Sequence, residues 1–240
     1  MKILFTDLDA TLLDKDDYSY DVNLVKKLKK KGVPIVFCSS KTRAEQEYYR
    51  SAMGVTDSFI VENGSAIYIP KDYFSFPFEY DFLTEKYRVI VLGERYQKIR
   101  EVVDELGVKC FGRMSVEEVS KVTGLSEDLA KLAKQREYLE PLVLGEDEKE
   151  KLRLVEKAGL RWTYGGKFYS VIGKTDKGKA VKKLVELFRK EFGKVESIGI
   201  GDSPNDFSML EVVDKPFLIG NKKIRNFRVV ESFDEIFDEI

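Results

Sequence analysis

Short apolar runs alternate with amphipathic, helix-like segments near both ends of this 240-residue chain. Three of the runs stop at a hydroxyl or carboxylate residue: residues 2–6 before Asp7, residues 33–38 before Ser39, and residues 197–200 with Gly201 before Asp202. Strands that alternate with helices predict a parallel sheet joined by right-handed crossovers. Ligands bind at the carboxyl ends of strands in such sheets, so these polar residues should meet at one edge.

The pattern changes in the middle of the chain. Residues 70–82 are aromatic and irregular, as in a linker, and a second set of strands and helices follows up to residue 172. The first pattern returns with an amphipathic helix expected over 177–192. We therefore predict an α/β fold with a Rossmann-like parallel-sheet core over 1–80 and 173–240, and an α/β cap domain inserted at 81–172.

Periodicity and capping residues predict several further elements. Residues 58–61 and 66–69 should be strands, which the alternation assigns to the parallel sheet. In the insertion, residues 126–138 predict a helix and residues 142–144 a strand. The tail over 231–240 alternates acidic and apolar residues, which predicts a docked terminal helix.

Composition narrows the possible chemistry. The chain has no histidine and only two cysteines, which excludes Ser-His and Cys-His hydrolases, imidazole bases, a disulfide framework and thiolate zinc sites. A net charge of −1 does not favour nucleic acid or an anionic membrane as a partner. We find neither a signal peptide nor an apolar stretch of about 18 residues, and predict a cytoplasmic protein. High charge with few Cys, Met and His is also typical of a thermophile.

Four carboxylates should gather at the predicted edge. Asp7 and Asp9 follow the first strand, and Asp202 and Asp206 follow a later one. Alone, Asp-x-Asp is most often a loop or helix cap, and it does not fit a calcium loop, because the required Gly and Glu are missing. Together the four would repel one another unless a cation lay among them. Oxygen ligands without His or Cys favour Mg²⁺.

Two further residues could complete a phosphate site. Lys177 taken alone is best explained as a solvated helix-face lysine, and Ser39 as a satisfied hydroxyl at a strand end. Together they would supply the positive charge and the hydrogen-bond donor that a phosphate needs.

In this order the motifs resemble those of the haloacid dehalogenase (HAD) superfamily of aspartate-nucleophile phosphatases. The motifs are Asp7-x-Asp-x-Thr11, Ser39, Lys177 and Gly201-Asp-x-x-Asn-Asp206, and the insertion looks like the α/β cap of the sugar-phosphatase branch. The resemblance implies hydrolysis through an aspartyl-phosphate on Asp7, with Asp9 as general acid and then base. Ser39 would hold a phosphoryl oxygen, and Lys177 would neutralise charge.

The resemblance also implies how Mg²⁺ would be held. The carboxylates of Asp7 and Asp202 and the backbone carbonyl of Asp9 would be ligands, and Asp206 would act through water or from behind them. Ala10 stands where Gly is most frequent in the family, which should matter only if its φ is positive.

A narrower set of segments is similar to one family of this branch, the mannosyl-3-phosphoglycerate phosphatases. The segments are residues 37–45, 62–65, 136–138 and 165–169. This similarity implies a small phosphorylated glycoside that carries a phosphate, a carboxylate and a sugar. The substrate-binding residues that we expect are Thr11, Ser40, Lys41, Arg43, Asn63, Gly64, Arg136 and Asn205.

Two of these expectations have plain structural alternatives. Arg136, on a cap helix, could bind the substrate carboxylate in a fork or simply pair with Glu137 or Glu140 on a surface. Gly165-Gly166 could admit the sugar closely or be an ordinary turn.

Other functions stay open at this point. Another sugar phosphatase or a phosphomutase would use the same core motifs. A Mg²⁺- or phosphate-dependent binding protein without turnover is disfavoured, because Asp7, Asp9 and Lys177 are all present. The basic run at 26–31 is explained more simply by solvated helix-face lysines than by nucleic-acid binding. The sequence does not indicate the oligomeric state.

Overall fold

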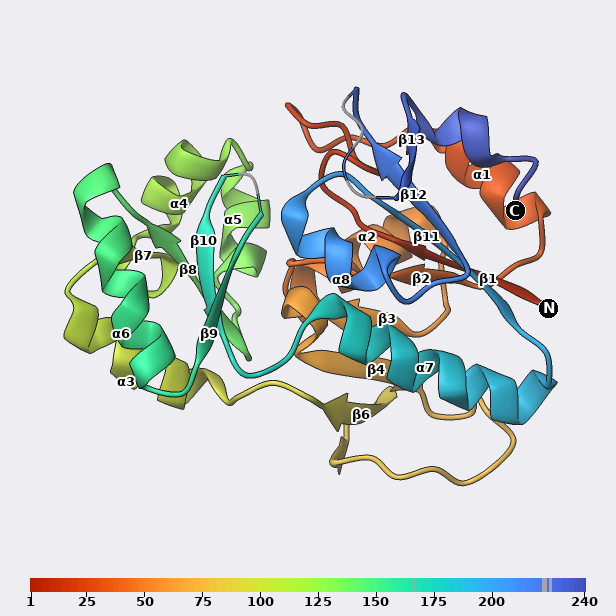
Figure 1. Ribbon diagram of the computed structural model, residues 1–240, viewed down its shortest axis with the longest axis horizontal. Helices are drawn as coiled ribbons and strands as arrows, with labels where there is room; N and C mark the ends of the chain where they lie inside the picture. The colour runs from red at the N-terminus through yellow and green to blue at the C-terminus, as the bar shows by residue number, and fades with distance from the viewer. Residues whose placement is uncertain (166, 222–223, 225) are drawn as a thin grey trace.

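The computed structural model describes residues 1–165, 167–221, 224 and 226–240. Two α/β units lie side by side, and Figure 1 shows both chain termini on the larger one, far from the smaller unit. We call the larger unit the core and the smaller one the cap. Within the described residues, no helix has the length and apolar character needed to cross a membrane.

The core is built on a five-stranded parallel sheet, as the alternation of strands and helices predicts. Its order is β13-β12-β11-β1-β2. The strands are β1 (Lys2–Thr6), β2 (Ile35–Phe37), β11 (Glu196–Gly201), β12 (Lys215–Ile219) and β13 (Arg228–Val230). Because the central strands are covered on both faces, they read as nearly continuous apolar runs.

Helices cover both faces of this sheet. Leu4 of β1 belongs to the apolar cluster of α1 (Val22–Lys30) and α2 (Arg43–Met53), where Asp21 caps α1 as expected. Ile3 and Phe5 belong to the opposite cluster, with α7 (Lys177–Phe192) and α8 (Phe207–Leu210). Successive side chains of a strand point to opposite faces, which explains this division.

A second, antiparallel sheet extends the core in the order β3-β4-β6-β5. It consists of β3 (Phe59–Val61), β4 (Ala66–Pro70), β5 (Phe82–Leu83) and β6 (Tyr87–Val91). The prediction that residues 58–61 and 66–69 join the parallel sheet is therefore wrong in part. β3 meets it only through an isolated parallel bridge between Cys38 and Ile60. The connection between β3 and β4 is too short for a crossover, so these strands pair as a hairpin.

The cap has its own four-stranded antiparallel sheet in the order β7-β8-β10-β9. The strands are β7 (Lys109–Cys110), β8 (Leu139–Val143), β9 (Arg161–Tyr164) and β10 (Tyr169–Ile172). One apolar cluster joins this sheet to α3 (Tyr96–Leu106) and α6 (Leu152–Lys157). A second cluster is formed mainly by α4 (Val116–Thr123) and α5 (Glu127–Ala133). Ser115 and Glu118 form the capping box expected at the start of α4.

Two helix predictions are wrong in length. The helix expected over 126–138 ends at Ala133, and the following strand begins at Leu139 rather than at residue 142. The backbone N–H groups of Glu137 and Tyr138 bind the carboxylate of Glu62 in the core instead of continuing a helix. The tail over 231–240 is docked, but its helix is a single 3₁₀ turn over Phe233–Ile236.

The position of the domain boundary follows from strand pairing. β6 pairs with β4 of the core, whereas α3 packs on β8 of the cap. We propose that the insertion begins between Val91 and Tyr96, later than residue 81, and that it ends after Ile172.

Candidate active site

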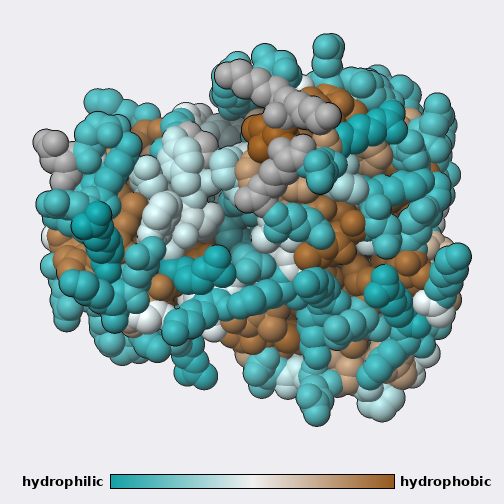
Figure 2. Space-filling model, in the orientation of Figure 1, coloured by the Kyte–Doolittle hydropathy of each residue, from teal (hydrophilic) through white to brown (hydrophobic). Residues whose placement is uncertain are grey.

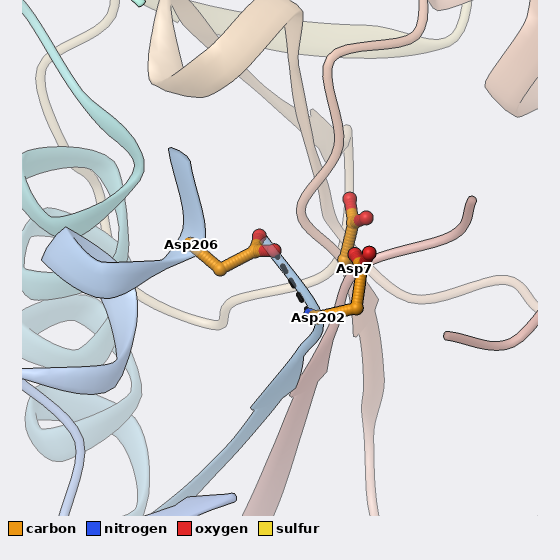
Figure 3. A group of neighbouring side chains, drawn as sticks. All are labelled: Asp7, Asp202 and Asp206. Carbon is orange, nitrogen blue, oxygen red and sulfur yellow. Dashed lines mark hydrogen bonds between the residues drawn. The ribbon is translucent and has the colours of Figure 1, made fainter. Parts of the chain in front are cut away.

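Three carboxylates meet at the carboxyl edge of the parallel sheet. Asp7 follows β1, Asp202 follows β11, and Asp206 closes the 3₁₀ turn Pro204–Asp206 that comes next. Figure 3 shows the side chains of the three residues converging just beyond the ends of the strands. One carboxylate oxygen from each lies within 4.8 Å of the others. The predicted convergence of strand ends thus places Asp7 and Asp202 side by side.

Lys177 is the cation of this cluster. It is completely buried, and its Nζ lies 2.7 Å from Asp7 Oδ1 and 2.5 Å from Asp206 Oδ1. It is therefore not the solvated helix-face lysine of the alternative interpretation. The other oxygen of Asp206, Oδ2, accepts hydrogen bonds from the backbone N–H groups of Asp202 and Ser203, at 3.2 and 3.1 Å. Asp206 is thus fully engaged in holding Lys177 and the turn.

The first turn of α7 places Lys177. Asp176 caps the helix by accepting a hydrogen bond from Lys179 N at 2.9 Å. Gly64 packs directly on this point: a Cβ there would lie 2.2 Å from the backbone oxygen of Asp176, and its φ is +88°. Thr175 Oγ1 donates to the Gly64 carbonyl at 2.9 Å. Gly64 therefore positions Lys177 by close backbone approach.

This cluster has more negative than positive groups. Burial, together with Asp206 and Asp202 and against the effect of Lys177, raises the pKa of Asp7 to about 8. Burial and the neighbouring Asp206 raise the pKa of Asp202 to about 6. Burial opposes the charge of Lys177, but the Asp206 and Asp7 carboxylates outweigh it and raise its pKa. When all three carboxylates are ionised, they and the one ammonium carry a formal charge of −2, so the all-oxygen cluster suits a hard divalent cation.

A second charged group lies beside the first. Lys41 is 4% exposed, and its Nζ is 2.9 Å from Asp9 Oδ1 and 3.4 Å from Glu45 Oε1. Arg136 of the cap approaches Glu45 Oε2 at 3.7 Å. Two carboxylates and two cations make this group formally neutral. The carboxylate of Asp9 faces Lys41 and is not part of the Asp7, Asp202 and Asp206 cluster.

A cavity of about 640 Å³ lies between core and cap above these groups. Its core side includes Asp7, Asp9, Asn63, Asp202 and Asn205. Its cap side is largely apolar, with Phe111, Leu125, Leu139, Pro141 and Phe168, and also carries Arg136 and Lys167. Away from the cavity, polar side chains cover most of the face shown in Figure 2, with hydrophobic patches mainly on the core.

Comparison with known proteins agrees with this arrangement. A sequence profile described as haloacid dehalogenase-like hydrolase matches residues 4–87 and 110–227. The chain belongs to this family. Its relatives include a Pyrococcus furiosus protein named mannosyl-3-phosphoglycerate phosphatase, 45% identical over all of both chains. A Methanococcoides burtonii protein named glucosyl-3-phosphoglycerate/mannosyl-3-phosphoglycerate phosphatase is 46% identical over 90% of this chain and 84% of its own.

Solved structures support the fold. A Thermoplasma acidophilum protein has a TM-score of 0.69 at 17% identity, over 100% of this chain and 96% of its own. A sugar phosphatase of HAD subclass IIB has a TM-score of 0.64 at 17% identity, over 93% and 89% of the two chains. The predicted HAD core with an inserted α/β cap is confirmed.

The expected substrate-binding residues of this HAD-like hydrolase fall into two sets. Ser40, Lys41, Asn63, Arg136 and Asn205 line the cavity, and Asn205 Nδ2 donates to Asn63 Oδ1 at 3.1 Å. The others, Thr11, Arg43 and Gly64, stand outside the lining. Ser39, which we expect to hold a phosphoryl oxygen, is also outside it and fully buried.

Arg43 and Arg136 are engaged differently from what we expect. Arg43 is paired with Glu47 and Glu137, at 2.9 and 3.0 Å. Arg136 lies beyond the end of α5, not on a helix, and donates to the carbonyls of Ser40 and Ala133 at 2.7 and 2.8 Å. The surface ion pair of Arg136 with Glu137 or Glu140 is absent from the described ion pairs, and the side chain is only 7% exposed.

Sequence reasoning missed Glu62. It is completely buried, and it accepts the backbone N–H groups of Glu137 and Tyr138 at 3.0 and 2.9 Å, which ties the core to the cap. Burial raises its pKa to about 7, against the opposing effect of Arg136. Its segment is one that resembles the family, but nothing local marks this glutamate as buried.

Two loop expectations have mixed outcomes. Ala10 has a φ of +54°, so the departure from Gly does put an alanine in the left-handed region. The Gly165-Gly166 prediction cannot be followed through, because Gly166 lies outside the described residues. Gly165 itself lines the cavity.

Proposed function

We propose that this HAD-like hydrolase converts mannosyl-3-phosphoglycerate to mannosylglycerate and phosphate through an aspartyl-phosphate on Asp7. The observation that carries the proposal is a buried aspartate held by a buried lysine on the floor of a cavity that the cap closes. Relatives of 42–46% identity named for this activity support the choice of substrate.

Asp7 would be the nucleophile. Its Oδ1 accepts from Lys177, which leaves Oδ2 to form a bond to phosphorus while the ester P–O bond breaks. Lys177 keeps positive charge next to the anion that must attack an anionic phosphate. Ser39 lies two residues beyond the end of β2, and its loop would hold a phosphoryl oxygen.

Asp9 would move the protons. Its carboxyl would give a proton to the departing glycerate oxygen, and its carboxylate would then take one from the water that hydrolyses the aspartyl-phosphate. The side chain is 39% exposed and lines the cavity, so it can meet both the substrate and water.

The cluster of Asp7, Asp202 and Asp206 fits Mg²⁺ by charge and donor type. We propose that the carboxylates of Asp7 and Asp202, with the carbonyl of Asp9, hold the ion. Asp206 is already bound to Lys177 and two N–H groups, which suits an outer position. When bound, Mg²⁺ would neutralise charge on the transferred phosphoryl group.

The rest of the cavity suits a phosphorylated glycoside. Its volume of about 640 Å³ lies within the usual range for small-molecule sites. Two N–H groups of Arg136 donate to backbone carbonyls, and the side chain is buried at the cap edge. We assign its guanidinium to the glycerate carboxylate. Phe111 and Phe168 line the cavity and would contact the sugar.

Glucosyl-3-phosphoglycerate is a second candidate substrate. The relative from M. burtonii is named for both compounds and is as similar to this chain as the P. furiosus protein. A phosphomutase would share the nucleophile, but it would return the phosphoryl group to a sugar and release no phosphate.

The test is phosphate release in Mg²⁺ and in EDTA from mannosyl-3-phosphoglycerate, glucosyl-3-phosphoglycerate, mannose 6-phosphate, sucrose 6-phosphate and 3-phosphoglycerate. We expect Mg²⁺-dependent release that strongly favours one or both glycosyl compounds. Asp7→Asn should abolish it, and Asp72→Asn, an exposed substitution of the same kind, should not. Equal turnover of simple sugar phosphates would overturn the substrate, and an active Asp7→Asn would overturn the nucleophile.

A further inference from the structure

Lys41 occupies an unusual place for a substrate-binding lysine. Its ammonium is buried, with Asp9 Oδ1 at 2.9 Å and Glu45 Oε1 at 3.4 Å. The ring centroids of Tyr18 and Tyr49 lie 5.0 and 5.6 Å away. Two carboxylates and two aromatic rings surround the charge, so little of it is left for a substrate anion.

The backbone of Lys41 is also held in place. Its N–H donates to Ser39 Oγ at 3.3 Å. Its carbonyl accepts from Glu62 N and Gln46 Nε2 at 3.1 and 3.3 Å. A lysine anchored at both ends is suited to fixing a partner side chain in one position.

We propose that Lys41 is a positioning residue for Asp9, and that it does not bind the substrate. This inference rests on the proposed function. Lys41 holds Oδ1 of Asp9 away from the three-carboxylate cluster, so that the Asp9 carboxyl stays available for proton transfer to the leaving oxygen. Asp9 loses its proton to that oxygen as the P–O bond breaks, and regains one from the attacking water. Lys41 keeps its protons throughout.

The cap completes this arrangement. Glu45 Oε1 meets Lys41, while Oε2 accepts from Thr42 N at 2.9 Å and faces Arg136 of the cap. Arg136 also donates to the carbonyl of Ser40, the residue before Lys41. Docking of the cap therefore adds a positive charge that keeps Glu45, and through it Lys41, in place.

The test compares two leaving groups in Lys41→Met. A glycerate oxygen needs a proton as it departs, whereas p-nitrophenolate does not, so only the first depends on a well-placed Asp9. We expect the first-turnover rate with mannosyl-3-phosphoglycerate to fall about 100-fold. The burst of p-nitrophenol from p-nitrophenyl phosphate should change by less than about threefold, because Asp9 does not assist this departure. Lys86→Met, an exposed lysine on the core, is the control and should change neither rate.

Two further variants keep the test decisive if Lys41→Met is unstable. The double variant Lys41→Met with Glu45→Gln removes one charge of each sign and should show the same selective loss. Lys41→Arg keeps a cation near Asp9 and should restore much of the rate. A rise in KM for mannosyl-3-phosphoglycerate with unchanged kcat would overturn the inference and return Lys41 to substrate binding. An equal loss with both substrates would also overturn it.

These outcomes are separate from those of the proposed function. Absence of phosphate release by the unmodified protein from any glycosyl phosphoglycerate would overturn the function, whereas the leaving-group comparison concerns only variants of an active protein.

Discussion

Lys177 and Lys41 are two buried lysines beside the same cavity, and each touches two carboxylates. Lys177 contacts Asp7 and Asp206, and Lys41 contacts Asp9 and Glu45. The first group lies wholly within the core. The second receives Arg136 from the cap.

The difference lies in the remaining charge. The Lys177 group, with Asp202, keeps a formal charge of −2, whereas the Lys41 group is neutral once Arg136 is counted. A cation is therefore attracted to one group and not to the other, although both are rich in carboxylates. Counting acids in the sequence cannot separate the two groups, because the separation depends on which lysine faces which acid.

The largest expected effect comes from Lys177→Met. It leaves three carboxylates clustered without their cation, so the metal-free protein should lose about 3–5 kcal/mol of unfolding free energy at pH 8. Phosphatase activity should fall by about 1,000-fold or more. Urea unfolding in EDTA measures the first effect, with Lys179→Met on the exposed side of α7 as the control. If Lys177→Met unfolded in EDTA at the same urea concentration as the unmodified protein, Lys177 would not be needed to balance these carboxylates.

The next prediction concerns Mg²⁺, which should bind the Lys177 group and not the Lys41 group. At a Mg²⁺ concentration 100 times its Kd, the free energy of unfolding should rise by about 2.7 kcal/mol, provided the ion binds only the folded state. Asp202→Asn should weaken Mg²⁺ binding at least about tenfold, as measured by calorimetry, because it removes a carboxylate of the charged group. Asp9→Asn, which keeps its backbone carbonyl, should weaken it less than about threefold by the same reasoning. Equal losses would place the Asp9 carboxylate in the metal site.

Glu62, which ties the core to the cap, should make the stability of the protein depend on pH. Its pKa is raised from 4.5 to about 7, so the folded state holds a proton that the unfolded state has lost. The unfolding free energy should therefore fall as pH rises from 4.5 to about 7, by at most about 1.4 kcal/mol per pH unit.

Glu62→Gln should remove that slope, since the amide does not titrate. The two proteins are compared by urea unfolding across this pH range in saturating Mg²⁺, which keeps the carboxylates of the Asp7 group ionised. An unchanged slope in the variant would assign the pH dependence to other carboxylates.

The smallest effect concerns the loop that joins the two groups. Ala10 has a φ of +54°, a left-handed conformation that costs an alanine about 1–2 kcal/mol. Ala10→Gly should therefore stabilise the protein by about 0.5–1 kcal/mol, after the entropy cost of glycine is subtracted. Ala52→Gly, in the exposed face of α2, is the matched control and should destabilise by about the same amount. Destabilisation by Ala10→Gly would show that the loop is not strained.

Much of the core is predictable because its signals are local. β1 and β11 end where their apolar runs end, so Asp7 and Asp202 follow the strands at the expected positions. The motif order then identifies the HAD-like family without any knowledge of packing. The helix expected over 126–138 fails for the opposite reason: its last residues bind Glu62, which is 75 positions away from Glu137.

The candidate site divides in the same way. Residue types and their order by themselves determine an acidic strand edge, a lysine at the start of α7 and an inserted cap. Only the tertiary structure decides that Lys41 faces Asp9, that Gly64 positions α7 and that Arg136 reaches the core. Strand ends and helix caps depend on neighbouring residues, whereas the partner of a buried charge depends on which distant segments exclude water around it.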